Sequence, residues 1–592
     1  MGEGEAPQGL SAATMCEAFQ ATAAERPDAP ALRLKDSDYA ASWAEFAATV
    51  RVRAAGFAAL GVGRGDTVGF MLANRPAFFL ADTAAMHLGA TCFSVYNTSS
   101  PEQVEYVVGD AANRVIVTEQ ALLDQVLAAR ERVETLEHVV VVDGDAPEGT
   151  ISLEELEGMA DPGFDFEATW RAVEPEDVLC LIYTSGTTGP PKGVQLTHAN
   201  MLAQLQAGQE IWGFPAGGRT ISFLPAAHIA DRWGNLYSQM AYGRCVHCLP
   251  VVQELVAYTI EVKPTVWGGV PRIWEKLKAA LETGMAAEQD QAKRVATEQA
   301  MGIARRWVEA YLAGEIPDDL QAEWDRADEL VFSKIRAMLG IDEVECFAVG
   351  AAPTPPDVLK FFLGLGIEIS ELWGMSETTA VATINPPGKV RVGTVGPPIP
   401  GVEVKLADDG EVMVRGPVVM KGYRNMPEKT EETFGEDGWL LTGDVGEFDE
   451  AGYLRIVDRK KELIINAAGK NMSPAAIEGK LKAASPLIAH AVAIGDRRPY
   501  NVALLTLDPE TLAARGAPAD DPEIAAEVER AVEEANQRLS RVEQIKRYKV
   551  LDGDWAPGGE ELTPTLKLKR RPIERKYEAE IEGLYEESPE VA

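Results

Sequence analysis

The chain has 592 residues, too many for one hydrophobic core, so we expect at least two domains. Its 56 lysines and arginines against 92 aspartates and glutamates give a formal net charge of −36, which argues against nucleic acid as a partner because phosphate binding needs a basic surface. The N-terminus lacks an apolar signal segment, and no apolar run is long enough for a transmembrane helix, so we expect a cytoplasmic protein.

Helical and strand patterns alternate along the N-terminal half of the chain. Strands separated by helices are typical of βαβ units, so the sequence predicts an α/β fold with parallel sheets. Cys245 and Cys248 share one of the strands and have no second pair nearby, so we interpret them as strand residues and not as a metal or redox site. The expected helices span 15–25, 41–60, 77–88 and 122–133, and the expected strands span 67–72, 91–95, 115–118, 139–143, 178–183, 193–197, 220–224, 244–250 and 265–268.

Residues 275–338 are rich in Ala, Glu, Lys and Arg and predict a helical insertion interrupted near Gly314 and Pro317. The charges alternate in sign, which favours a water-facing helical segment over a basic membrane-binding one. A peripheral membrane contact or an oligomer contact is the alternative interpretation of this insertion.

The C-terminal half begins with further strands at 346–350 and 367–372 around a helix at 356–363. Residues 392–415 are interrupted by Gly and Pro and contain apolar residues at every second position, which predicts a small antiparallel sheet or barrel. A charge run starts at Asp458, and we place a domain boundary there. The predicted domains are 1–458 and 459–592, the second with helices at 474–484 and 524–539 and a strand at 489–495.

One stretch, Tyr183-Thr-Ser-Gly-Thr-Thr-Gly-Pro-Pro-Lys-Gly193, has the composition of a polyphosphate site. Glycines let backbone N–H groups approach phosphate oxygens, hydroxyls add donors, and Lys192 adds a positive charge. Pro191 stands directly before the lysine, so this is not a P-loop. A polar surface turn is the competing interpretation. The candidate phosphate-binding residues are Thr184, Ser185, Gly186, Thr187, Thr188 and Lys192.

This stretch resembles the signature loop of the adenylate-forming enzymes: acyl-CoA synthetases, luciferases and the adenylation domains of peptide synthetases. Further segments resemble motifs of that family in the same order, from about residue 30 to about residue 575. The resemblance implies a large N-terminal domain of stacked mixed sheets with helices and a small β-barrel-like part, and a small mobile α+β C-terminal domain. The matching segments are Gly350-Ala-Ala-Pro353, Trp373-Gly-Met-Ser-Glu-Thr378, Thr442-Gly-Asp444 and Leu562–Arg571.

The resemblance also implies roles in nucleotide binding. Glu377, with Thr184, is expected to hold the Mg²⁺ that bridges the ATP phosphates, since a hard cation prefers carboxylate oxygen. Asp444 and Arg459 match the residues that hold the ribose. Trp373 replaces a usual tyrosine and keeps a ring for stacking on adenine. The remaining expected nucleotide-binding residues are Gly350, Ala351, Ala352, Gly374 and Thr378.

Three residues are expected to take part in the chemistry. Lys569 lies four residues after Thr565, the spacing of the family's catalytic lysine, which lowers the repulsion between the carboxylate and the α-phosphate. Its neighbour Lys567 could be mistaken for it, and a merely basic tail is the alternative. His228 matches the histidine beside the carboxylate, although a satisfied core histidine is the competing interpretation.

Lys461 aligns with the hinge about which the family's small domain rotates between two half-reactions. After the rotation, Gly469 and Lys470 are expected to lie along the path of CoA. Ala468 stands where the family commonly has glycine, so close approach of CoA to this loop is less certain.

The resulting prediction is a long-chain fatty acid–CoA ligase that uses ATP, Mg²⁺ and CoA, as a monomer or homodimer. The helical insertion and the segments flanking it resemble the long-chain branch of the family. An acyl-AMP ligase that loads a carrier protein is one alternative. A non-catalytic acyl- or nucleotide-binding regulator is another, although that class would be expected to lose Lys192, Glu377 or Lys569.

Overall fold

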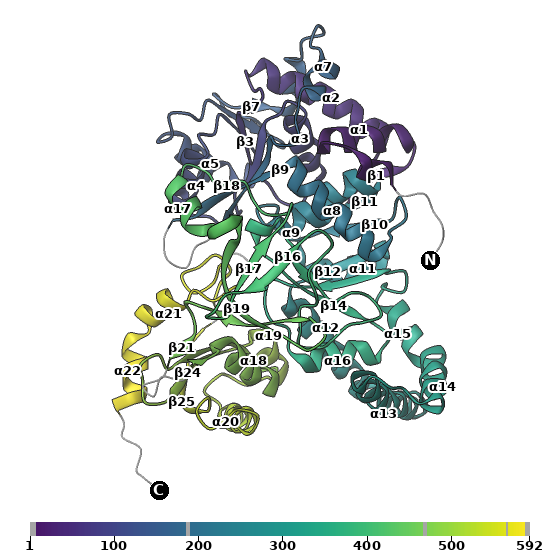
Figure 1. Ribbon diagram of the computed structural model, residues 1–592, viewed down its shortest axis with the longest axis vertical. Helices are drawn as coiled ribbons and strands as arrows, with labels where there is room; N and C mark the ends of the chain where they lie inside the picture. The colour runs from purple at the N-terminus through teal and green to yellow at the C-terminus, as the bar shows by residue number, and fades with distance from the viewer. Residues whose placement is uncertain (1–6, 185–189, 466–470, 554, 564–565, 587–592) are drawn as a thin grey trace.

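The computed structural model describes residues 7–184, 190–465, 471–553, 555–563 and 566–586. Figure 1 shows a large part, which runs from the N-terminus through the green strands, and a smaller part at the lower left that ends at the C-terminus. The fold is α/β with several mixed sheets and a small antiparallel sheet, as predicted. Within the described residues, no helix is long and apolar enough to cross a membrane.

The largest sheet has eight strands and is mixed, because β3 pairs in parallel with β4 and β5 while β8 pairs antiparallel with β9. Its central strands are apolar on both faces since each face packs on its own layer: Val115 and Val117 belong to one core, and Ile116 belongs to another. The strand order is β18 (Gly422–Tyr423), β9 (Lys192–Thr197), β8 (Val178–Thr184), β4 (Thr91–Ser94), β3 (Thr67–Met71), β5 (Val115–Thr118), β6 (His138–Val141) and β7 (Ile151–Ser152).

Capping residues set the first residue of some helices beside this sheet, and α2 (Trp43–Ala59) is an example. We expected a helix from residue 41, but Ala41 and Ser42 belong to β2 (Ala40–Ser42), and the Ser42 hydroxyl caps the helix in a capping box with Glu45. The helices are α1 (Met15–Glu25), α2 (Trp43–Ala59), α3 (Pro76–Met86), α4 (Pro101–Asp110), α5 (Leu123–Arg130), α6 (Leu153–Gly158), α7 (Phe166–Arg171) and α8 (His198–Trp212).

Two four-stranded sheets follow, and both end near the centre of the large part. The first has the order β10 (Arg219–Ser222), β11 (Cys245–Cys248), β1 (Pro30–Leu34) and β2. Both cysteines of β11 are buried, and the described residues contain no cluster of three or more His, Cys, Asp or Glu side chains arranged to hold a metal ion. The second sheet has the order β12 (Val266–Gly269), β13 (Cys346–Val349), β14 (Ile369–Trp373) and β15 (Thr383–Ile384).

The alternating segment near residue 400 forms the predicted small antiparallel sheet. It contains β16 (Glu403–Leu406), β17 (Glu411–Arg415), β19 (Leu440–Phe448) and β20 (Leu454–Arg459). Apolar side chains of this sheet and of α8 share one core, which also includes Trp373. The small sheet is therefore packed against α8 and the end of β14.

The insertion at 275–338 is helical and lies at the lower right of Figure 1. Its long helix α13 ends where Gly314 adopts a left-handed conformation, as glycine does without strain. Ala304 and Val308 of α13 pack on Gly364, the last residue of α16 (Pro356–Gly364). The helices are α12 (Pro271–Ala287), α13 (Gln291–Ala313), α14 (Asp318–Ala327), a π-helical stretch (Asp328–Phe332) and α15 (Ser333–Met338).

The C-terminal part has its own hydrophobic cores, built from residues 464–581. The domain boundary between 458 and 459 stays a prediction, and β20 extends to Arg459. Ion pairs join the two parts: Arg272 to Asp508 at 2.5 Å and Lys276 to Glu510 at 3.0 Å. The elements are β21 (Ile464–Ile465), β22 (Asn471–Met472), α18 (Pro474–Ala484), β23 (Ile488–Ile494), β24 (Asn501–Leu507), α19 (Pro509–Arg515), α20 (Pro522–Gln537), β25 (Ile545–Val550), α21 (Arg570–Lys576) and α22 (Glu578–Glu586).

Candidate active site

A cavity of about 2290 Å³ lies where the sheets and the C-terminal part meet. Typical small-molecule pockets measure roughly 300–1,000 Å³, so this one has room for more than one ligand at a time. It brings together many of the residues predicted from the sequence. These are Thr184, Lys192, His228, Gly350, Ala351, Ala352, Trp373, Gly374, Glu377, Asp444, Arg459 and Lys461.

The Gly-rich stretch joins two paired strands. β8 and β9 form an antiparallel pair in which Thr184 lies opposite Lys192. Both of these residues line the cavity. The other predicted loop residues, Ser185, Gly186, Thr187 and Thr188, lie outside the described residues.

A chain of contacts links Lys192 to Glu377 through a tyrosine that sequence analysis missed. The Lys192 ammonium lies 4.3 Å from the centre of the Tyr423 ring and 3.3 Å from its hydroxyl. The Tyr423 hydroxyl donates a hydrogen bond of 2.8 Å to Oε1 of Glu377. Burial lowers the pKa of Lys192, and the charge of Glu377 opposes that shift. Tyr423 lies far along the chain, and only the pairing of β18 with β9 brings it here, so no local motif could have revealed it.

Glu377 fits the role of a magnesium ligand. Its side chain is 5% exposed and lines the cavity, and no described residue donates to the second carboxylate oxygen, Oε2. That oxygen is free to bind a hard cation, which Thr184 at the end of β8 can also approach. When bound, Mg²⁺ would neutralise charge on the ATP phosphates.

Trp373, Asp444 and Arg459 form a second connected group. The Trp373 indole N–H donates to Oδ2 of Asp444 at 2.9 Å, and Nε of Arg459 lies 2.8 Å from Oδ1. Asp444 and Arg459 face each other across the β19–β20 pair, which fixes their contact. The usual tyrosine could not donate from this ring position, so the tryptophan gives the aspartate a partner of its own.

Two glycines let the chain segments around Trp373 approach closely. A Cβ atom at Gly374 would lie 2.1 Å from the Ala380 carbonyl oxygen, and one at Gly350 would lie 2.5 Å from a Leu372 methyl carbon. Ala351 has a left-handed backbone (φ 71°), and Ala352 follows it on the same cavity wall. Thr378 does not line the cavity: it is fully buried, and its hydroxyl bonds to the Met375 backbone.

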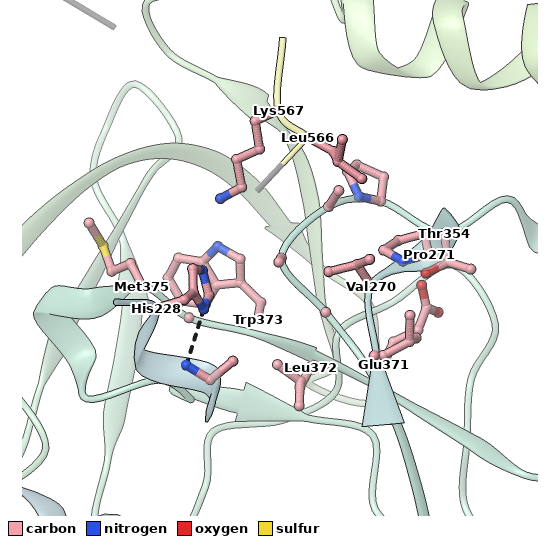
Figure 2. A pocket seen from close by; sticks show the side chains of 18 of the residues that line it. His228, Val270, Pro271, Thr354, Glu371, Leu372, Trp373, Met375, Leu566 and Lys567 are labelled. Atoms are coloured by element: carbon pink, nitrogen blue, oxygen red, sulfur yellow. Dashed lines mark hydrogen bonds between the residues drawn. The ribbon is translucent and has the colours of Figure 1, made fainter. Parts of the chain in front are cut away.

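The C-terminal lysines lie differently from our expectation. Figure 2 shows Lys567 pointing toward the rings of His228 and Trp373, and Lys567 lines the cavity. Lys567 is exposed as a whole residue, and desolvation of its ammonium group, together with the nearby Arg459, lowers the pKa of that group. Lys569 is absent from the cavity wall, and its Nζ donates to the Gly559 carbonyl at 2.8 Å. The structure thus brings Lys567, and not Lys569, to the other site residues.

His228 is oriented by the backbone. Its Nδ1 accepts a hydrogen bond of 3.1 Å from the Ala230 N–H, drawn as a dashed line in Figure 2. Burial, with a smaller contribution from Lys567, lowers the pKa of His228 to about 4. The ring is therefore neutral at physiological pH with Nδ1 as the acceptor, which leaves its Nε2–H as a donor.

The predicted hinge residue Lys461 lies in a turn after β20 and lines the cavity. Its neighbours are fixed by backbone bonds, Lys460 N–H to the Gly443 carbonyl and Glu462 N–H to the Arg459 carbonyl. Gly469 and Lys470, predicted for the CoA path, lie outside the described residues.

Replacing Tyr423 by phenylalanine should lower kcat/KM for ATP up to roughly tenfold, the effect of one lost hydrogen bond. The ring would still contact Lys192, but Glu377 would lose its donor. Pyrophosphate release at varied ATP measures the effect. Tyr453→Phe is the control, because that hydroxyl donates to the Lys389 carbonyl away from the cavity. Equal values for Tyr423→Phe and wild type would contradict the role given to this hydroxyl.

Comparison with known proteins places the chain in a family. It matches the model of the AMP-binding enzymes over residues 19–424 and that of the AMP-binding enzyme C-terminal domain over residues 461–589. The chain is 54% identical over 449 residues to Mycobacterium tuberculosis fadD11, provisionally named a fatty-acid–CoA ligase, with 74% of this chain and 79% of that protein covered. The long-chain-fatty-acid–CoA ligase FadD15 of the same organism is 36% identical over 561 residues, or 92% of each chain.

Solved structures share the fold. An anthranilate–CoA ligase, AuaEII, in complex with anthranoyl-AMP has a TM-score of 0.75 at 20% identity, covering 96% of this chain and 98% of that one. ATP-bound MatB from Rhodopseudomonas palustris has a TM-score of 0.71 at 23% identity, covering 95% and 99%. The family matches, together with the fold, confirm that the chain belongs to the AMP-binding, adenylate-forming enzymes.

Proposed function

We propose that the protein is an AMP-forming fatty acid–CoA ligase. In the first half-reaction a carboxylate oxygen attacks the α-phosphorus of ATP, and pyrophosphate leaves as acyl-AMP forms. In the second, the sulfur of CoA attacks the acyl carbonyl carbon, AMP leaves, and the thiol proton is released. The observation that carries this proposal is the position of Lys567 in the same cavity as Lys192, Glu377 and Asp444. The names of the two mycobacterial relatives support the choice of fatty acid and CoA.

We assign the adenylation step to Lys567 and His228, which line the same cavity. Lys567, which lines the cavity, would stand between the carboxylate and the α-phosphate and lower their repulsion, the role that the sequence suggested for Lys569. The His228 Nε2–H can donate to a carboxylate oxygen. A positioned pair of donors would hold the two anions in reactive geometry without transferring a proton.

The nucleotide occupies the rest of the cavity in this proposal. Lys192, Thr184 and Glu377 would hold the phosphates with Mg²⁺. Asp444 and Arg459 would receive the ribose hydroxyls, and Trp373 would stack on the base. Gly350, Ala351 and Ala352 would border the adenine and the start of the acyl chain.

The thioester step is assigned to a second arrangement of the C-terminal part. Lys461 would act as the hinge, and Gly469 and Lys470 would border the CoA path after rotation. Cytoplasmic location, peripheral membrane contact and a monomeric or homodimeric state remain predictions.

The test measures pyrophosphate release and acyl-CoA formation across acids from acetate to stearate, with and without CoA. We expect kcat/KM to rise with chain length, because each buried methylene contributes about 0.8 kcal/mol, and CoA to be consumed. Accumulation of acyl-AMP without thioester would favour a carrier-protein ligase. No acid-dependent pyrophosphate release would favour a non-catalytic regulator, and an optimum at acetate would contradict the long-chain assignment.

A further inference from the structure

One arginine in the cavity wall is buried without a counter-ion among the described residues. Arg244 lies directly before β11, is 4% exposed and lines the cavity. No described residue accepts a hydrogen bond from its guanidinium group or forms an ion pair with it, and its Nη2 is shielded from solvent with no acceptor. The exposed Glu345 acts on it only through a long-range charge effect.

Arg244 lines the cavity beside the Cys346 end of the β12–β13 pair. β12 and β13 run side by side, with Gly268 opposite Ala348 near the site and Val266 opposite Cys346 further back. Arg244 acts electrostatically on the Cys346 end of this pair. Cys346 lies four residues behind Gly350, or roughly 13 Å at the rise of a strand. Three of these five residues, Gly268, Ala348 and Gly350, have small or no side chains, and all five line one cavity.

Aromatic rings surround the guanidinium but do not neutralise it. The Arg244 guanidinium carbon lies 4.5 Å from the centre of the Phe214 ring and 4.4 Å from that of Tyr242. Such contacts recover part of the cost of removing a charge from water, yet they leave the hydrogen-bond donors unused. The Tyr242 hydroxyl is already engaged with the Leu205 carbonyl at 2.6 Å. Because buried charges in proteins are normally paired, a ligand in this cavity is suited to supply the missing partner.

We propose that the acyl end of the cavity binds acids with a second carboxylate at the distal end of the chain, that is, α,ω-dicarboxylic acids. This inference rests on the proposed acid–CoA ligase function and names its substrate class. A carboxylate supplies the negative charge and the planar pair of acceptors that a guanidinium matches. Thr220, 3% exposed on the neighbouring strand β10, adds a hydroxyl that has no partner within the described residues.

The loops beside the reacting carboxylate, 267–271 and 348–353, contain no charged residue that could bind a second polar end of the acid. These loops line only the near end of the acyl path. Arg244 belongs to neither loop, and only the three-dimensional structure places it on the same cavity.

The first experiment uses the wild-type enzyme and kcat/KM for pyrophosphate release. Monocarboxylic acids from octanoate to palmitate are compared with the diacids and the ω-hydroxy acids of the same lengths. We expect the diacid to exceed the matched monoacid by roughly 10- to 100-fold at one chain length, the range for one charge-assisted hydrogen bond. The preference should peak at that length because Arg244 lies at a fixed distance from the reacting end. A preference for the ω-hydroxy acid over the diacid would overturn the proposal.

The second experiment compares variants. Arg244→Met should abolish the diacid preference and leave the monoacids as the better substrates, while Arg244→Lys should keep part of it. Arg33→Met, which removes an exposed arginine outside this cavity, is the matched control and should leave the ratio unchanged. Circular dichroism and ATP binding verify that each variant is folded.

The outcomes separate the inference from the function on which it rests. Activity on monoacids with none on diacids, or a diacid-to-monoacid ratio that Arg244→Met does not change, would overturn the inference and leave the ligase function standing. Absence of pyrophosphate release with every acid would instead reject the proposed function itself.

Discussion

Replacing Lys567 by alanine should lower fatty-acid-dependent ATP–pyrophosphate exchange by roughly 100- to 1000-fold, the loss typical of one electrostatic donor in an active site. The lysine faces the cavity and lies in the field of Glu377 and Asp444, where the two reacting anions would meet. Thioester formation from supplied acyl-AMP and CoA should survive, because that step has no repulsion between carboxylate and ATP. The test measures ATP–pyrophosphate exchange and thioester formation on the same preparation of the variant and compares each with the wild type.

Lys569→Ala is the matched control for this prediction. It removes the same charge two residues away, from a side chain bonded to the Gly559 carbonyl. Its exchange activity should stay close to that of the wild type. The reverse result, with Lys569→Ala inactive and Lys567→Ala active, would restore the assignment made from sequence spacing and reject the one made from the structure.

Replacing Lys461 by proline should abolish acyl-CoA formation while fatty-acid adenylation persists. Proline fixes φ and would block a rotation at this position. The Lys461 N–H has no backbone acceptor among the described residues, so proline removes no hydrogen bond from the arrangement seen here. The measurement pairs pyrophosphate exchange with thioester formation from supplied acyl-AMP.

Lys461→Ala serves as the control, since it removes the side chain and leaves the backbone free to rotate. It should keep both half-reactions. If Lys461→Pro lost adenylation and thioester formation to the same degree, the change would reflect general damage and the hinge assignment would fail.

The fold could be predicted in large part because its signals are local. Apolar runs marked the central strands, and alternation marked the small sheet around β17. Boundaries were less accurate where a cap decides them, as at Ser42. The mixed pairing of β8 and β9 with β18 could not be read from the sequence, because strand partners depend on packing between distant segments.

Sequence motifs were enough to select residues that line the cavity, as for Glu377 and Asp444. Motif spacing could not decide between Lys567 and Lys569, because the path of the backbone determines which of the two side chains reaches the cavity. Leu566, directly before Lys567, has a left-handed backbone (φ 62°), and the Lys569 N–H bonds to the Glu561 carbonyl. Arg570 is then held by Glu478 in a bidentate pair. These long-range contacts, which spacing does not encode, decide which lysine enters the cavity.

The ion pairs that join α12 to Asp508 and to α19 have a consequence for the proposed switching between the two half-reactions. Exposed pairs such as Lys276 with Glu510 contribute only about 0–1 kcal/mol each in water. Weak ion pairs of this kind shift the equilibrium between the two proposed orientations of the C-terminal part only slightly, whereas a large apolar interface would strongly favour one orientation. Since the attraction is screened by dissolved ions, ionic strength becomes a control on the balance between the two states. In the proposed rotation, turnover of the whole enzyme depends in part on these weak ion pairs, whose four residues line the same cavity as the reacting groups.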